Sequence, residues 1–195
     1  MKASNKIYDN QTVLIIAEAG VNHNGDVESA KKLIHSAREC GADCIKFQTF
    51  KAERVATAHA EKAEYQLHTT DPGESQIDML KKLEFPENAY PELISLCEEI
   101  GIMFLSTPYN IEDIDFLDSM GVKAFKVASG QVVEPDFLSH MAKKAKPIYL
   151  STGMCTLAEV YEAVEIIRKA GNDDITVLQC TANYPSAVED CNLKA

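Results

Sequence analysis

A regular alternation of short apolar runs with amphipathic segments limits the fold more than any other feature of this chain. The runs are rich in Val, Ile, Leu and Phe, as expected for strands that helices bury. The segments between them repeat apolar residues every three or four positions, which is typical of helices with one buried face. Such alternation predicts a parallel sheet covered by helices. The predicted strands are residues 12–18, 43–49, 102–108, 123–129, 147–153 and 175–181.

The predicted helices are bounded by residues that favour helix ends. Asp26 is an N-cap for residues 25–40, and Gly41 suits the left-handed position just past that helix. Thr156 and Glu159 form a capping box at the start of the helix predicted over 156–170. A polar excursion, residues 50–73, follows the second strand. The remaining helices are predicted at residues 74–83, 89–100, 110–120 and 134–145.

Two fold classes fit this rhythm, a doubly wound open sheet and a (β/α)8 TIM-type barrel. A dinucleotide-binding open sheet carries G-x-G-x-x-G after its first strand, whereas this chain has "AGVNHNG" there. Polar residues end every predicted strand, as in barrels whose chemistry lies at the carboxyl rim. A barrel of this class takes about 250 residues. The 195 residues hold six β/α units, so we expect one incomplete barrel domain over residues 1–195 and a partial sequence.

Composition excludes several classes of partner and compartment. The formal net charge of −11 argues against nucleic acid and anionic membranes as partners. No apolar run approaches the roughly 20 residues of a membrane span, and the N-terminus lacks the apolar core of a signal peptide. The six cysteines form no C-x-x-C pair, so we expect reduced, mostly buried thiols and a cytoplasmic protein. The histidines show no spacing typical of metal ligands.

Lysines occupy positions in two predicted strands where apolar residues are the rule. Side chains alternate along a strand, so Lys46 shares a face with Gln48, and Lys126 lies on one face of the fourth strand. Glu18 ends the first strand. A buried charge is costly unless it is paired. The lysines are therefore either an anion pocket at the strand ends, or structural groups that pair with Glu18 or extend toward solvent.

Neighbouring polar residues extend this candidate pocket. Hydroxyl and backbone donors are offered by Ser106, Thr107, Ser129, Ser151 and Thr152, with a small, open turn at 151–153. The stretch "AEAGVNHNG" adds Glu18 as acid, base or hydroxyl acceptor, and Asn22, His23 and Asn24 as a lining for a sugar. These turn residues alternatively serve only the backbone conformation. Tyr184 either caps the pocket or packs at its edge.

Six strings together resemble the sialic acid synthase family, which condenses phosphoenolpyruvate with N-acetylmannosamine or related amino sugars. In chain order they are "IIAEAGVNHNGD", "GADCIKFQTFKAE", "FLSTPYN", "KVASG", "PIYLSTGM" and "LQCTANYP". They cover nearly the whole chain from Val13 onward. The resemblance is closest to the bacterial branch that makes N-acetylneuraminic or legionaminic acids. The segment after the second strand is similar to the lid of this family.

The resemblance implies a complete (β/α)8 barrel, a C-terminal antifreeze-like domain, a homodimer and a divalent manganese or magnesium ion. It implies that Glu18, Lys46 and Lys126 are catalytic. The lysines and hydroxyls would hold the phosphate and carboxylate of phosphoenolpyruvate, and Glu18 would contact the open-chain N-acetylated amino sugar. The substrate-binding residues that it implies, with neighbouring candidates, are Asn22, Gln48, Thr107, Ser129, Gln131, Ser151, Thr181 and Tyr184.

The chain departs from the family pattern in three places. The two metal-binding histidines of the family come from the seventh and eighth strands, beyond Ala195, so we expect no metal bound by this chain alone. Gln131 stands where the family usually has a carboxylate, and an amide cannot act as a base. The segment after it reads "VVEPD" where the family favours paired asparagines. The antifreeze-like domain is absent from residues 1–195.

Three hypotheses about function therefore remain open. The first is a synthase of this family, active as a longer chain. The second is a sister phosphoenolpyruvate-condensing synthase that acts on a phosphorylated sugar. The third is a truncated, inactive barrel fragment that only binds phosphoenolpyruvate or a partner, since an open barrel exposes a sheet edge.

Overall fold

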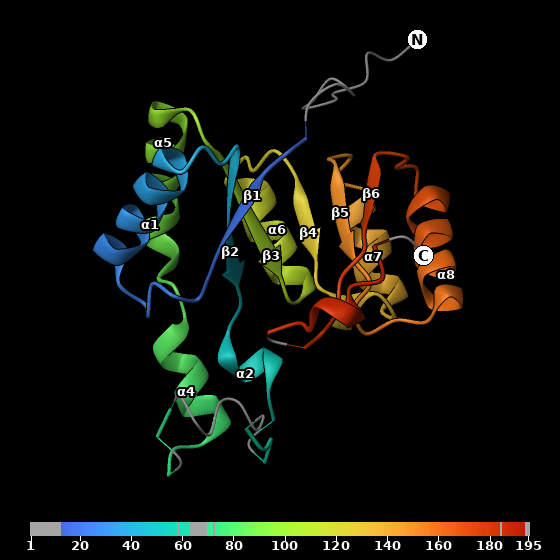
Figure 1. Ribbon diagram of the computed structural model, residues 1–195, viewed down its shortest axis with the longest axis horizontal. Helices are drawn as coiled ribbons and strands as arrows, with labels where there is room; N and C mark the ends of the chain where they lie inside the picture. Colours follow the sequence, from blue (N-terminus) through green and yellow to red (C-terminus); the bar gives the residue numbers. More distant parts are fainter. Residues whose placement is uncertain (1–12, 58, 63–69, 72, 184, 194–195) are drawn as a thin grey trace. The chain divides into compact units, whose positions relative to one another are not determined.

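The computed structural model describes residues 13–57, 59–62, 70–71, 73–183 and 185–193 (Figure 1). The chain is an α/β protein with parallel strands. It divides into two compact units, one spanning Leu14–Asp113 and the other running from Ile114 onward. Here they are called the N-terminal unit and the C-terminal unit, and each is described by itself. No helix in the described part of the chain is long and apolar enough to cross a membrane.

A three-stranded parallel sheet forms the centre of the N-terminal unit. Its strands are β1 (Ile16–Gly20), β2 (Cys44–Thr49) and β3 (Met103–Pro108), in the order β1-β2-β3. Helices α1 (Val27–Glu39) and α5 (Tyr90–Ile100) contact each other and lie on the same side of the sheet (Figure 1). Each strand therefore has one face against helices, while the opposite face is left for other side chains.

Aromatic rings fill the space on the helix side of this sheet. Phe47 of β2 stacks on Phe104 of β3 with ring centroids 5.5 Å apart, and Tyr90 of α5 meets Phe104 edge-on. Hydroxyls join this layer, because Thr49 Oγ1 lies 2.9 Å from the Tyr90 hydroxyl and 2.7 Å from Ser106 Oγ. Since side chains alternate, the neighbours of Phe47 and Thr49 in β2 project from the other face.

Short helices lie beyond the carboxyl end of β2 (Figure 1). Glu84 joins α2 to the end of α4, since its Oε1 accepts a hydrogen bond of 2.7 Å from the Ala52 amide. Lys81 pairs with Glu53 at 2.8 Å and links the same two helices. The helices of this region are α2 (Ala52–Val55), α4 (Gln76–Leu83) and the short η1 (Glu87–Ala89).

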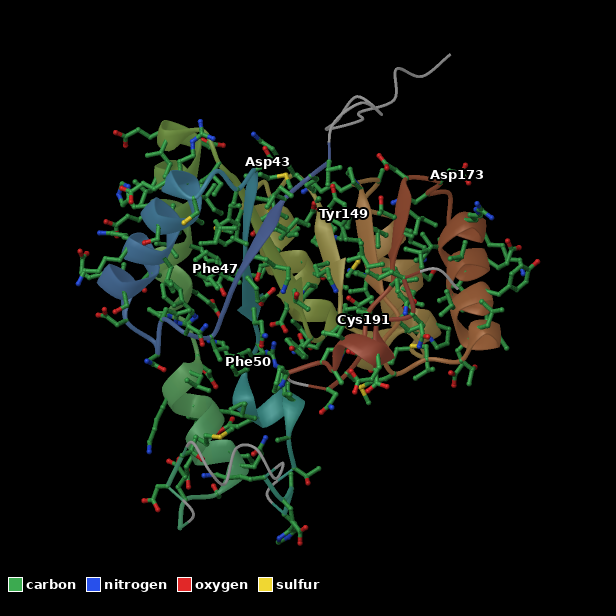
Figure 2. The ribbon with its side chains drawn as sticks, in the orientation of Figure 1. Asp43, Phe47, Phe50, Tyr149, Asp173 and Cys191 are labelled. Carbon is green, nitrogen blue, oxygen red and sulfur yellow. The ribbon has the colours of Figure 1, made fainter. Side chains whose placement is uncertain are left out.

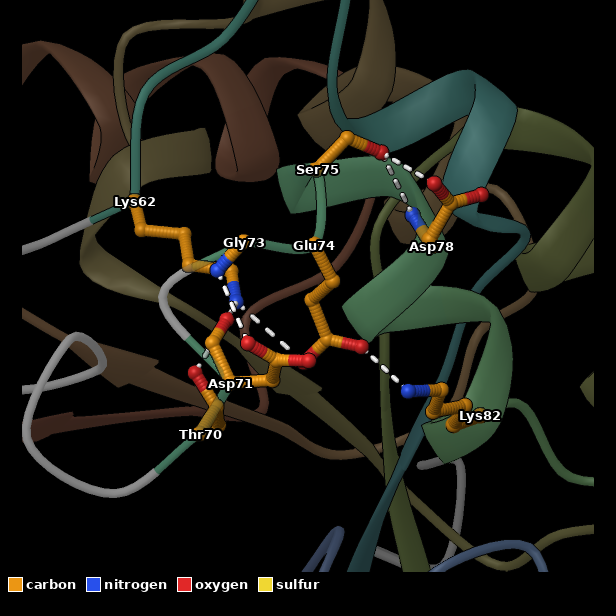
Figure 3. Close-up of polar contacts among 8 residues, drawn as sticks. All are labelled: Lys62, Thr70, Asp71, Gly73, Glu74, Ser75, Asp78 and Lys82. Atoms are coloured by element: carbon orange, nitrogen blue, oxygen red, sulfur yellow. Dashed lines mark hydrogen bonds and ion pairs between the residues drawn. The ribbon is translucent and has the colours of Figure 1, made fainter.

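Charged residues before and within α4 contact one another (Figure 3). Lys62 donates to Thr70 Oγ1 at 3.0 Å, to the Asp71 carbonyl at 2.7 Å and to Glu74 Oε1 at 3.2 Å. The second carboxylate oxygen of Glu74 pairs with Lys82. Lys62, Glu74 and Lys82 are called the loop network below. All three donors of the Lys62 ammonium have acceptors, so the hydrogen bonding of Lys62 is complete without any ligand.

A second three-stranded parallel sheet forms the centre of the C-terminal unit, in the order β4-β5-β6. Helices α7 and α8 pack against each other beside this sheet (Figure 1). Helix α6 (Ile111–Ser119) links the two units. The strands are β4 (Phe125–Val127), β5 (Ile148–Ser151) and β6 (Ile175–Leu178). The helices are η2 (Ser129–Gln131), α7 (Pro135–Ala142), α8 (Leu157–Lys169) and η3 (Val188–Asp190).

All six predicted strands are present, in the predicted parallel sense. The bounds predicted for the first strand are wrong, because β1 begins at Ile16 and extends to Gly20 rather than ending at Glu18. Val13 is 81% exposed and lies outside the β1–β2 hydrogen-bond ladder. Its apolar side chain led to a predicted strand start that was too early. Consecutive strands are neighbours within both sheets, as in a barrel and unlike a doubly wound sheet with its reversal of strand order. Closure into a barrel stays a prediction.

The predicted helix ends agree with the structure where a capping side chain defines them. Asp26 accepts from the Ser29 amide at 2.7 Å, and Gly41 has φ +82°. The capping box of Thr156 and Glu159 is formed. The cysteines are all free thiols, as predicted. They are less buried than predicted, because only Cys44 and Cys97 are buried.

Candidate functional site

An ion pair across two neighbouring strands marks the site in the N-terminal unit. Glu18 of β1 and Lys46 of β2 are opposite each other in the parallel register, and the carboxylate contacts the ammonium. Lys46 is the third of the six residues of β2, a strand that runs from the side of Asp43 toward that of Phe50 (Figure 2). The Lys46 side chain is 13% exposed, whereas that of Glu18 is 51% exposed. The pair, called the strand-end pair below, therefore joins a sequestered ammonium to a carboxylate that solvent reaches.

Gln48 lies on the same face of β2 as Lys46, one pleat closer to the carboxyl end. It is opposite Thr107 of β3, which is buried. Its Oε1 accepts a hydrogen bond of 3.2 Å from the Tyr109 hydroxyl. The structure thus brings Glu18, Lys46, Gln48 and Thr107 together on one face of β1, β2 and β3. The alternation of side chains predicted that Lys46 and Gln48 share this face.

Lys126 forms the centre of the candidate site in the C-terminal unit. It is 7% exposed, and its Nζ donates to the Val127 carbonyl at 2.7 Å and to the Ser151 hydroxyl. Ser151 ends β5, so a lysine and a hydroxyl meet at the carboxyl ends of two paired strands. Ser129 follows β4 and begins η2. Lys126 and Ser151, both proposed for the pocket from the sequence, are thus in contact.

The sequence proposed four further site residues. The Oε1 atom of Gln131 is buried and has no hydrogen-bond partner within the described part of the chain. The Thr181 hydroxyl donates to Ser186 Oγ at 2.7 Å. Asn22 is exposed in the turn after β1. Tyr184 lies outside the described residues. Gln131 therefore offers a buried acceptor that a ligand or a water molecule would satisfy.

Two hydroxyl residues proposed for the pocket, Ser106 and Thr152, have other hydrogen-bond partners. Ser106 contacts Thr49 on the helix side of the sheet, away from Gln48, because alternation gives Ser106 and Thr107 opposite faces. Thr152 is already engaged, since its amide donates to Cys180 Sγ at 3.2 Å and its hydroxyl to the Leu178 carbonyl at 2.8 Å. The predicted open turn at 151–153 is wrong as well. A β-carbon on Gly153 would lie 2.9 Å from a backbone atom of Thr181, so the turn is closely packed.

His23 does not line a sugar pocket. It is 1% exposed, on the side of the sheet that carries Phe47, and its ring meets that of Phe85 edge-on at 4.6 Å. Its Nδ1 accepts a hydrogen bond of 3.0 Å from the Gly25 amide. Burial lowers the pKa of His23, so the ring is neutral with its proton on Nε2. The alternative interpretation of Asn24 and Gly25 as turn residues is confirmed by their φ angles of +49° and +73°.

Sequence reasoning missed Tyr109, which contacts Gln48, and Asp113, which holds the backbone of Tyr109. The Tyr109 amide donates to Asp113 Oδ2 at 3.2 Å, at the start of α6. Burial raises the pKa of Asp113 to about 6, against partly compensating hydrogen bonds from the amides of Tyr109 and Asn110 and the charge of Arg54. The position of Tyr109 directly after β3 was the sequence feature that could have identified it as a candidate site residue.

The side-chain chemistry of the described residues does not fit a divalent metal. No group of three or more His, Cys, Asp and Glu side chains lies close enough together in that part of the chain to hold such an ion. Lysines and hydroxyls dominate both groups of site residues instead, and these donate to anions rather than coordinate cations. Each group is thus suited to binding phosphate or carboxylate oxygens.

Comparisons with known proteins identify the family of this chain. The sequence profile of the NeuB family matches residues 33–195. The chain belongs to the NeuB family. It is 48% identical over 184 residues to the N,N'-diacetyllegionaminic acid synthase of Campylobacter jejuni, covering 93% of this chain and 55% of that protein. It is 46% identical over 188 residues to the synthase of the same name from Legionella pneumophila, covering 94% and 53%.

A solved structure shares the fold as well. The N-acetylneuraminic acid (sialic acid) synthetase of Leptospira borgpetersenii, crystallised with citrate, superposes with a TM-score of 0.80 at 28% identity. The match covers 94% of this chain and 59% of that one. The chain thus spans about half the length of the curated relatives that it matches.

Proposed function

We propose that the protein, in its full length, condenses phosphoenolpyruvate with an N-acetylated amino sugar to give a nonulosonic acid and inorganic phosphate. Membership of the NeuB family and the names of the two synthases support this reaction class. The product named for both relatives carries two N-acetyl groups, which favours a diacetylated sugar as the substrate. A cytoplasmic homodimer with a (β/α)8 barrel, together with an antifreeze-like domain in the remaining length, belongs to the same proposal.

The observation that carries the proposal is a pair of sequestered lysines at strand ends. Lys46 has three donors, of which Glu18 engages one, and Lys126 is in contact with the Ser151 hydroxyl. Phosphoenolpyruvate carries a phosphate and a carboxylate, and the charge-assisted hydrogen bonds of lysine suit both groups. In a closed barrel all strand carboxyl ends share one rim. A common site for the two lysines stays a prediction of this proposal.

The chemistry assigns a role to each group. Lys46, Lys126 and Ser151 hold the two anionic groups of phosphoenolpyruvate, with Ser129 and Thr107 as further hydroxyl donors. Carbon C3 of the enol then attacks the aldehyde carbon of the open-chain sugar, forming the C–C bond while the aldehyde oxygen takes up a proton. The Glu18 carboxylate accepts a hydrogen bond from a hydroxyl group of that sugar. Positioning of the two reactants supplies much of the rate enhancement.

Water completes the reaction at C2. The cation that develops there is attacked by water, the water loses a proton, and the C–O bond to phosphate breaks in the tetrahedral intermediate. Gln131 has a buried, unsatisfied oxygen that orients this water by accepting a hydrogen bond, but its amide takes no proton at neutral pH. The proton is therefore passed to the departing phosphate or to solvent. Because the described residues do not fit a metal, no step is assigned to one.

Phosphate release from the full-length protein tests the proposal. The protein is incubated with phosphoenolpyruvate and manganese, and separately with N-acetylmannosamine, an N,N'-diacetylated amino sugar or N-acetylmannosamine 6-phosphate. Release with an unphosphorylated sugar, together with a product one three-carbon unit larger, supports the synthase. Release with the phosphorylated sugar alone assigns the protein to a sister synthase. Phosphoenolpyruvate binding without release under any condition identifies a binding protein and refutes the catalytic proposal.

A further inference from the structure

Tyr109 is held at three points beside the strand-end pair. Its amide is fixed by Asp113, as described above, and its ring meets the Phe50 ring edge-on with centroids 5.9 Å apart. Its hydroxyl donates to Gln48 Oε1 at 3.2 Å. A hydroxyl on a ring that is fixed by both backbone and packing is a directed donor. It therefore determines how the Gln48 amide is oriented.

Two polar groups of opposite character, Glu18 Oε1 and Gln48 Nε2, both lie beside Gly20. The region between these two atoms is called the Gly20 gap below. The φ of Gly20 is +53°, and the β1–β2 register shifts between Glu18 and Gly20. A β-carbon on Gly20 would lie 3.2 Å from Glu18 Oε1 and 3.6 Å from Gln48 Nε2. The carboxylate oxygen is an acceptor, and the amide nitrogen carries two N–H donors. The acceptor and the donors thus lie on the same side of Gly20, where a β-carbon would be in tight contact with the carboxylate.

The orientation of the Gln48 amide decides what this gap can bind. With Oε1 engaged by Tyr109, the amide nitrogen lies on the Gly20 side, where it offers donors next to the Glu18 acceptor. A hydroxyl group can donate to the carboxylate and accept from the amide at the same time. If the amide turned by 180°, two oxygens would face each other across the gap. The gap would then lose the donor and gain a repulsion between acceptors.

We infer that Tyr109 is a positioning residue that selects the sugar-binding orientation of Gln48 and so makes the Gly20 gap a hydroxyl-binding subsite. The inference rests on the proposed function for the identity of the ligand, an amino sugar with free hydroxyls. Tyr109 itself need not touch the ligand. Its effect is therefore transmitted through Gln48 and should disappear when Gln48 is removed.

Steady-state kinetics of the full-length protein tests this inference. Tyr109→Phe keeps the ring on Phe50 and removes only the hydroxyl. It should raise the KM for the amino sugar about 3- to 10-fold, the usual worth of one hydrogen bond, with the KM for phosphoenolpyruvate unchanged. In a Gln48→Ala background the same substitution should have no further effect. Tyr161→Phe on α8, at an exposed tyrosine, is the matched control and should change neither constant.

Two outcomes would overturn the inference. One is an unchanged sugar KM in Tyr109→Phe, and the other is an equal effect of the substitution with and without Gln48. If wild-type protein turns over no sugar, the proposed function has failed, and the side-chain amide of Gln48 supplies the readout. Its two N–H resonances should shift and converge in Tyr109→Phe if the hydroxyl holds the amide. Resonances that the substitution leaves unchanged would refute the positioning role.

Discussion

Two arrangements of lysine and glutamate in the N-terminal unit look alike in sequence and differ in what they leave unsatisfied. In the loop network, the 3% exposed Lys62 side chain has three acceptors, and both carboxylate oxygens of Glu74 contact lysines (Figure 3). In the strand-end pair, Lys46 contacts Glu18 through one carboxylate oxygen, and the other oxygen faces the gap at Gly20. A saturated cluster holds a segment together, whereas spare hydrogen-bonding capacity at a strand end is suited to a ligand.

This difference decides between the two interpretations of a buried lysine. Burial alone does not, because Lys62 is more buried than Lys46. The Glu18–Lys46 ion pair expected of a purely structural role is present, yet Glu18 remains half exposed. A structural pair gains most when both partners are fully satisfied.

The largest expected effect is on binding of phosphoenolpyruvate. Lys46→Met removes charge-assisted hydrogen bonds and should weaken binding to the full-length protein on the order of 10- to 100-fold. Lys126→Met should have a similar effect. Lys62→Met, the matched control from the loop network, should change the affinity less than about twofold, because its donors are already engaged. Calorimetric titration measures all three, and equal losses for Lys46→Met and Lys62→Met would remove the contrast.

The next effect is a pH dependence of folding stability that arises from Asp113. The pKa of Asp113 is raised from 3.8 to about 6 by burial, so the folded state binds more protons than the unfolded state between these values. The free energy of unfolding should therefore fall as the pH rises from about 4 to about 6. Asp113→Asn should be more stable than wild type above pH 6, by roughly 3 kcal/mol, and similar below pH 4. Urea unfolding of both proteins across this range measures the difference. If the free energies of unfolding of the two proteins changed in parallel with pH, the assignment to Asp113 would be wrong.

A smaller effect is expected on the stability of the loop network. Lys62→Met leaves three acceptors without their donor, while Lys82 still compensates Glu74. The expected local loss is about 1 kcal/mol, typical of net hydrogen-bond contributions. Faster hydrogen exchange of the α4 amides in this variant would show this local loss of stability. Lys32→Met at an exposed site on α1 is the control, and exchange rates that match in the two variants would count against a structural clamp.

The smallest effect is a pH dependence of opposite sign in the loop network. Lys82 and Lys62 lower the pKa of Glu74 below its ordinary 4.5, partly offset by desolvation. The contribution of Glu74 is therefore complete above about pH 4.5 and is lost as the pH falls through its folded value. The protection of the α4 amides relative to their intrinsic exchange rate at each pH should fall on acidification in wild type and less so in Glu74→Gln. The same acid sensitivity in both proteins would refute this assignment.

The sequence determined the faces of strands better than their ends or their tertiary partners. The alternation in β2 correctly grouped Lys46 with Gln48, and helix caps such as Asp26 follow from local chemistry. The start of β1 was misjudged, because the apolar Val13 gives no sign that it lies outside the ladder. His23 was assigned to a sugar pocket, because its aromatic neighbours come from segments far along the chain.

The same limit explains the errors among the hydroxyls. Thr152 looks available in sequence, but its donors are engaged by the Cys180 thiol and the Leu178 carbonyl, about 26 to 28 residues away. Tyr109 was overlooked because its role depends on meeting Gln48, 61 positions earlier. Residue type and strand position propose candidates for a site, whereas tertiary contacts decide which of them still have donors or acceptors to offer.

Gly25 carries a consequence for how this chain can vary over evolutionary time. A β-carbon there would lie 2.9 Å from the Lys82 carbonyl oxygen, at the end of α4. The turn after β1 and the end of α4 therefore approach as closely as a bare backbone permits. Any sequence drift that places a side chain at position 25 must be accompanied by a retreat of residues 82–84. These two distant stretches should accordingly change together among descendants, or not at all.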